Sequence, residues 1–79
     1  MGALGQVFNE YVSATSKHGK FVSAHEGFAI LLEEVDELWE EVKKNPSKHP
    51  TRLIDIRDEA VQVAAMALRF LVDVCGEEL

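Results

Sequence analysis

Carboxylate side chains recur three residues apart at two places in this chain, and that spacing suits metal chemistry. Glu34 and Glu37 form the first pair, and Asp55 and Asp58 form the second. Residues three apart on an α-helix share a face, so each pair can direct its oxygens at one point. A short connection makes the two helices that carry them antiparallel neighbours, with the pairs at similar heights. The sequence therefore predicts that four carboxylates converge.

Such a convergence needs a counter-charge. Two like charges about 4 Å apart repel by about 1–4 kcal/mol at effective dielectrics of 80 to 20, so the group either takes up protons or binds a cation. Oxygen-only ligation favours Mg²⁺, with Mn²⁺ as the alternative. Mg²⁺ held by carboxylates commonly takes phosphate oxygens as further ligands, which indicates a substrate that carries phosphate.

A solvated acidic face is the competing interpretation, because Lys43 and Lys44 can pair with Glu40. Two observations favour a site. Acids greatly outnumber bases on the segment 33–41. On the next helix, the acids fall in the only polar arc of an otherwise apolar surface.

Three amphipathic helices are expected to position these groups. The first spans about residues 4–18, and Gly19 is expected to supply its left-handed C′ residue. The second opens at Ser23, which forms a capping box with Glu26, and is stopped by Asn45-Pro46. The third runs from residue 51 or 52 to residue 75, with Gly76 as its stop. The prediction is an all-α single domain, residues 1–79, with long antiparallel second and third helices.

The third helix is expected to need a second subunit. It is apolar over most of its circumference, and two short helices of the same chain can hardly cover it. A chain of 79 residues with one cysteine also has a marginal core and no internal disulfide. We therefore predict that the helical bundle is completed by oligomerisation, as a homodimer or homotetramer.

Composition excludes several function classes. A net charge of −6 disfavours binding to nucleic acid or to an anionic membrane surface. No apolar run reaches the roughly 18 residues of a membrane span, and the first residues lack the pattern of a signal peptide. The lone thiol, Cys75, fits a reducing compartment. The expectation is a cytoplasmic protein with no nucleic-acid or membrane partner.

The acidic segments resemble a known family. Glu33-Glu34-Val35-Asp36-Glu37 is similar to the EExxE motif of MazG-like, all-α nucleoside triphosphate pyrophosphohydrolases, and Asp55-Ile56-Arg57-Asp58 stands in the place of the ExxD motif that follows it. Seventeen residues separate Glu37 from Asp55, and the resemblance extends over about residues 18–73. It implies a Mg²⁺-dependent hydrolase that cleaves nucleoside triphosphates to the monophosphate and pyrophosphate, in house-cleaning of the nucleotide pool.

The resemblance also implies roles for particular residues. Glu34, Glu37, Asp55 and Asp58 correspond to metal ligands. Glu33 corresponds to a catalytic group, either a base that orients water or a residue that supports the metal ligands. Asp55 replaces the glutamate usual in the family, so ligation through a water or a contribution from Glu59 are alternatives.

Several residues are candidates for contact with the substrate. They are His25 at the start of the second helix, Arg57 beside the acidic pair, and Gln62 one turn beyond it. Lys17, Lys20 and Arg52 are further cations that could neutralise phosphate, while Phe28 and Trp39 fit a core or interface better than a base-stacking role.

The sequence is compatible with two other functions. The chain could be a non-enzymatic helical dimer that serves as an interaction module with a vestigial acidic site. A di-iron carboxylate protein fits less well, because such sites use Glu-x-x-His pairs and no histidine lies three residues after a glutamate here.

Overall fold

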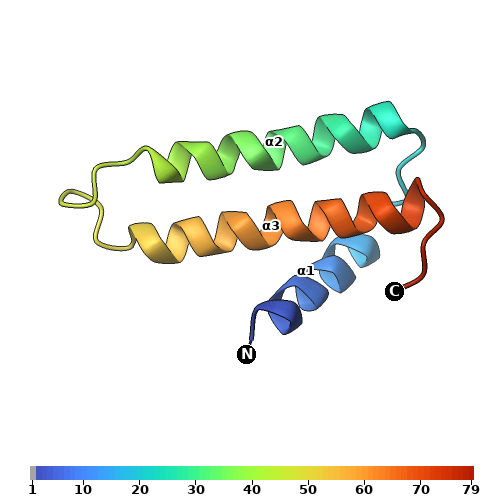
Figure 1. The fold of residues 1–79 in the computed structure, drawn as a ribbon, viewed down its shortest axis with the longest axis horizontal. Coiled ribbons are helices and arrows are strands. Elements are labelled where there is room, and N and C mark those ends of the chain that lie inside the picture. Colours follow the sequence, from blue (N-terminus) through green and yellow to red (C-terminus); the bar gives the residue numbers. More distant parts are fainter. Residues whose placement is uncertain (1) are drawn as a thin grey trace.

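The computed structural model describes residues 2–79, which form three α-helices and no strand. They are α1 (Ala3–Lys17), α2 (Ala24–Val42) and α3 (Arg52–Asp73). The all-α class is therefore confirmed. Figure 1 shows α2 and α3 side by side along their lengths, while α1 lies against the C-terminal half of α3. Within residues 2–79, no helix is both long and apolar enough to cross a bilayer.

The start of α2 has the capping box that the sequence predicts. The Ser23 Oγ accepts a hydrogen bond from the Glu26 backbone N–H at 3.1 Å. In return, the Glu26 carboxylate accepts one from the Val22 N–H at 2.9 Å. The first bond satisfies a backbone donor that a helix start otherwise leaves unpaired, and the second pairs the N–H of the residue before the cap. Together they fix where α2 begins.

The helix ends differ in part from expectation. The prediction that Gly19 is left-handed was wrong, because His18 leaves α1 in an extended conformation and Gly76, at φ 71°, is the one described glycine with positive φ. Gly76 does follow the end of α3, as predicted. α2 ends at Val42, before the Asn45-Pro46 stop, and Asn45 instead accepts hydrogen bonds from the Ser47 N–H and hydroxyl.

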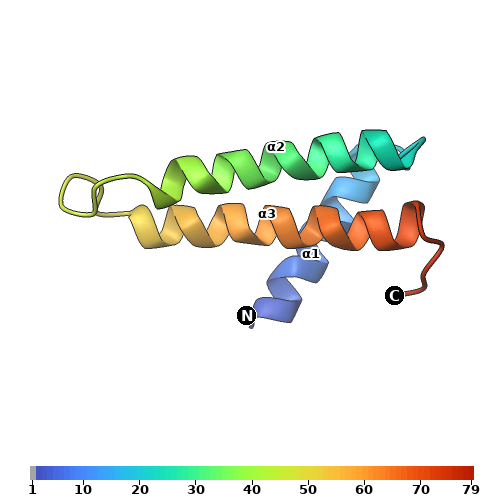
Figure 2. The ribbon, with the colours of Figure 1, turned by 45° about the horizontal axis from the view of Figure 1, so that its top comes forward.

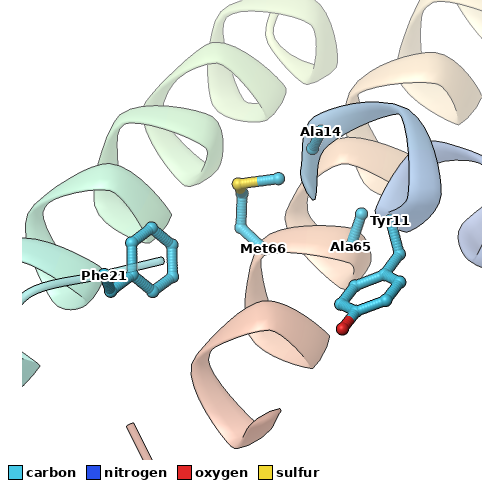
Figure 3. Packing of buried hydrophobic residues seen from close by; sticks show 5 residues of the cluster. All are labelled: Tyr11, Ala14, Phe21, Ala65 and Met66. Carbon is cyan, nitrogen blue, oxygen red and sulfur yellow. The ribbon is translucent and has the colours of Figure 1, made fainter. Parts of the chain in front are cut away.

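The buried core lies where α1 and the turn after it meet α3. Its buried side chains are Tyr11, Ala14, Phe21, Ala65 and Met66. Figure 3 shows Ala65 near Tyr11 of α1, and Met66 between Phe21 and Ala14. α3 thus serves as the central helix, because it packs against α1 on one side and against α2 on another.

Two contacts fix the register of α2 against α3. Near one end, Gly27 is buried, and a Cβ there would lie 2.8 Å from Cδ2 of Phe70. At the other end, the Arg52 guanidinium donates a hydrogen bond to the Val42 carbonyl oxygen. The start of α2 therefore lies beside the end of α3, and the glycine permits their close approach.

Candidate functional site

Three glutamates gather at the middle of the α2–α3 seam. Glu34 and Glu37 come from α2 and Glu59 from α3, and one carboxylate oxygen of each lies within 4.8 Å of the others. We call this group the glutamate triad. The sequence predicted the two residues of α2 as ligands and named Glu59 as an alternative contributor.

The structure places the other two predicted ligands outside this group. Asp55 accepts a hydrogen bond from the Thr51 hydroxyl at 3.0 Å, in the first turn of α3. Asp58 pairs with Arg57 at 3.1 Å, and both side chains are exposed. Glu37 is exposed as well, whereas Glu34 and Glu59 are half-buried.

Burial and mutual repulsion disfavour full ionisation of the triad. Burial, followed by the negative charge of Glu37, raises the pKa of Glu34 from 4.5 to about 7. The same two causes raise the pKa of Glu59. One carboxylate oxygen of Glu34 and one of Glu59 are buried with no hydrogen-bond partner. Such a group gains free energy by binding either a proton or a cation.

Glu34 also belongs to the wall of an open pocket of about 590 Å³. This volume lies in the range of small-molecule sites. The pocket lies between α1 and α2, with α3 contributing the third wall; Figure 2 gives a second view of these helices. The lining residues are Glu10, Ala14 and Lys17 of α1, the segment 18–22, Glu26, Ile30, Glu33 and Glu34 of α2, and Gln62, Met66 and Arg69 of α3.

The pocket contains some of the residues predicted to contact substrate. Glu33 and Gln62 line it beside Glu34. His25 is exposed in the first turn of α2 and is not among the lining residues. Arg57 is not among them either, since it points into solvent with Asp58.

Sequence reasoning missed the buried cation of this pocket, Arg69. By helical spacing it falls in the polar arc of the third helix, yet its side chain is only 3% exposed. The available signal was spacing, because Arg69 follows Gln62 by two helical turns and so shares its face. Lys17 and Lys20 were weighed as phosphate-binding cations, and both line the pocket.

Comparison of the chain with family models, curated proteins and solved structures gives no match.

Proposed function

We propose that this chain is a divalent-metal-dependent nucleoside triphosphate pyrophosphohydrolase of the MazG-like type. The observation that carries the proposal is the position of Glu34, which belongs both to the glutamate triad and to the wall of the pocket. A cation held by the triad would therefore lie at the edge of a cavity large enough for a nucleotide. The resemblance of residues 33–37 to the EExxE motif supports the same reaction.

The donor set of the triad fits Mg²⁺ or Mn²⁺, because all of its groups are carboxylates. Glu34, Glu37 and Glu59 would hold the ion, which would draw charge from phosphate oxygens and lower the pKa of a bound water. Asp55 and Asp58 stay predicted ligands from the sequence, without a part in the convergence seen in the structure.

Glu33 is the proposed base for the hydrolytic step. It lines the pocket next to Glu34, so its carboxylate can accept the proton of a water that attacks phosphorus. The new P–O bond forms as the α–β phosphoanhydride bond breaks, and pyrophosphate leaves with the electron pair. Gln62, on the opposite helix, would orient a phosphate oxygen or a ligand carboxylate.

We also propose that the active form is a homo-oligomer, either a dimer or a tetramer. Phe28, Leu32, Val35 and Trp39 recur at helical spacing along α2, yet they are 41–59% exposed. Leu53 and Ile54 at the start of α3 are exposed too. An apolar stripe of this length on a small chain is typical of an interface. The exposed thiol of Cys75 is compatible with the reducing cytoplasm.

The decisive assay is pyrophosphate release from a panel of ribo- and deoxyribonucleoside triphosphates with Mg²⁺. The test variant is Glu37→Gln, which removes a triad charge from an exposed position, and the matched control is Asp36→Asn, its exposed neighbour outside the triad. Turnover that Glu37→Gln abolishes and Asp36→Asn retains would support the enzyme. Absence of turnover with every nucleotide, together with no melting shift on adding Mg²⁺, would refute it and favour an interaction module.

A further inference from the structure

The pocket holds a buried positive charge that the hydrolytic step above does not use. The Arg69 guanidinium stacks over the Phe21 ring, with its central carbon 4.3 Å from the ring centroid. One of its Nη groups donates to the Gly19 carbonyl at 2.9 Å, while Nε has no hydrogen-bond partner. Within residues 2–79, no carboxylate forms an ion pair with it.

Such a charge is costly in a folded chain. A buried ion needs either an opposite charge or a complete set of hydrogen bonds to repay its desolvation. The Gly19 carbonyl, the Phe21 ring and the Met66 sulfur, a weak acceptor 3.5 Å from the other Nη group, supply only part of that. An anion bound nearby would supply the rest.

Two exposed lysines lie at the same end of the pocket. Lys17 closes the last turn of α1, and Lys20 follows in the segment that Arg69 holds through Gly19. Both line the pocket together with Arg69. Glu26 lines this end as well, but its carboxylate accepts the Val22 N–H and is committed to the α2 cap.

The pocket therefore has two poles of opposite charge. Arg69, at the cationic pole, lies seven positions after Gln62, which is beside the acidic pole; this is about 10 Å along a helix. A ligand that spans these poles has one part that accepts a metal ion and another that carries its own negative charge. A polyphosphate chain has both properties.

We propose that Lys17, Lys20 and Arg69 form an anion subsite that takes the terminal phosphate groups of the triphosphate. The two lysines contact the phosphate oxygens, and Arg69 acts as a positioning residue that fixes the segment 18–20 and adds positive potential behind it. The assignment of this subsite to a triphosphate rests on the proposed function, whereas anion binding by the cationic pole does not. The same subsite would retain the leaving pyrophosphate.

The test is titration of inorganic pyrophosphate into the ¹⁵N-labelled full chain, followed by NMR, in buffer freed of divalent metal. Saturable shifts are expected at the amides of residues 17–21. The double variant Lys17→Gln/Lys20→Gln should weaken pyrophosphate binding by on the order of tenfold or more, because it removes two charge-assisted contacts to phosphate oxygens. Both lysines are exposed, so the variant keeps its fold.

The matched control is Lys43→Gln/Lys48→Gln, two exposed lysines that do not line the pocket. Equal weakening by both double variants, or no saturable binding to the unmodified chain, would overturn the subsite and leave Arg69 as a structural brace. The two proposals can fail separately. Pyrophosphate binding that depends on the pocket lysines, without turnover of any nucleotide, would support the subsite and refute the hydrolase. Turnover without such binding would support the hydrolase and refute the subsite.

Discussion

Neutralising Glu34 should stabilise the metal-free protein at alkaline pH. The raised pKa of Glu34, about 7 against an ordinary 4.5, means that the folded state holds this proton more tightly than the unfolded state. The resulting stabilisation is fully present below about pH 4.5 and is lost as the pH rises through 7. Glu34→Gln keeps the side-chain shape and never acquires the charge, so it should escape this loss.

The size of the effect follows from the difference between the two pKa values. If the whole pKa difference acted on stability, the free energy of unfolding would change by about 3 kcal/mol. Glu34 is only half-buried, so solvent screening reduces the expected effect to about 1–2 kcal/mol. At pH 8 the Glu34→Gln variant should exceed the unmodified chain in free energy of unfolding by that amount, whereas near pH 4.5 the two should be similar.

Urea unfolding followed by circular dichroism would measure the free energy of unfolding of both proteins at pH 5, 6, 7 and 8. The protein concentration is held fixed because the chain is proposed to assemble. Asp36→Asn is the control, since Asp36 is an exposed acid of α2 outside the triad. Saturating Mg²⁺ should stabilise the unmodified chain at pH 8 more than the Glu34→Gln variant. The reasoning would be refuted if the difference in stability between Glu34→Gln and the unmodified chain did not change from pH 5 to 8. It would also be refuted if Asp36→Asn changed the stability by the same amount as Glu34→Gln.

Three further predictions concern packing, capping and assembly. Gly27→Ala should destabilise the chain by about 1 kcal/mol in urea unfolding, because overpacking of about 1–3 kcal/mol against Phe70 outweighs the helix propensity gained; Gly19→Ala, with no neighbouring atom within 4 Å of its Cβ, should be nearly neutral. Ser23→Ala should cost about 1 kcal/mol by the same measurement, through loss of the cap to the α2 backbone, and an unchanged midpoint would contradict the role of that bond. Trp39→Glu should lower the mass measured by light scattering while helical content is kept; an unchanged oligomer would place the interface elsewhere.

The sequence predicted the elements well because their signals are local. Hydrophobic spacing identified all three helices, and the Ser23–Glu26 box located the start of α2. The prediction for Gly19 failed because a tertiary contact fixes the chain there: Arg69 binds its carbonyl oxygen. Local patterns carry no information about a partner fifty residues away.

The composition of the candidate site depends on the register of α2 against α3, which local sequence patterns determine less precisely. Counting from the ends of the predicted helices placed Asp55 and Asp58 opposite Glu34 and Glu37. One of the two anchors of the register lies at the other end of the seam, where Gly27 meets Phe70. From this anchor, seven residues along α2 lead to Glu34, and eight back along α3 lead to Gln62.

The same register brings Glu37 level with Glu59, so the pair of α3 that faces the two glutamates of α2 is Glu59 and Gln62. Asp55 falls about one turn nearer the connection, where its charge acts on Lys44. One helical turn is about 5.4 Å, larger than the separation of the triad oxygens, and this displacement is enough to exchange one set of ligands for another. Measuring the Mg²⁺ affinity of Glu59→Gln and of Asp55→Asn tests this register directly. The register requires Glu59→Gln to weaken Mg²⁺ binding more than Asp55→Asn does. The opposite order would restore the pair predicted from spacing alone.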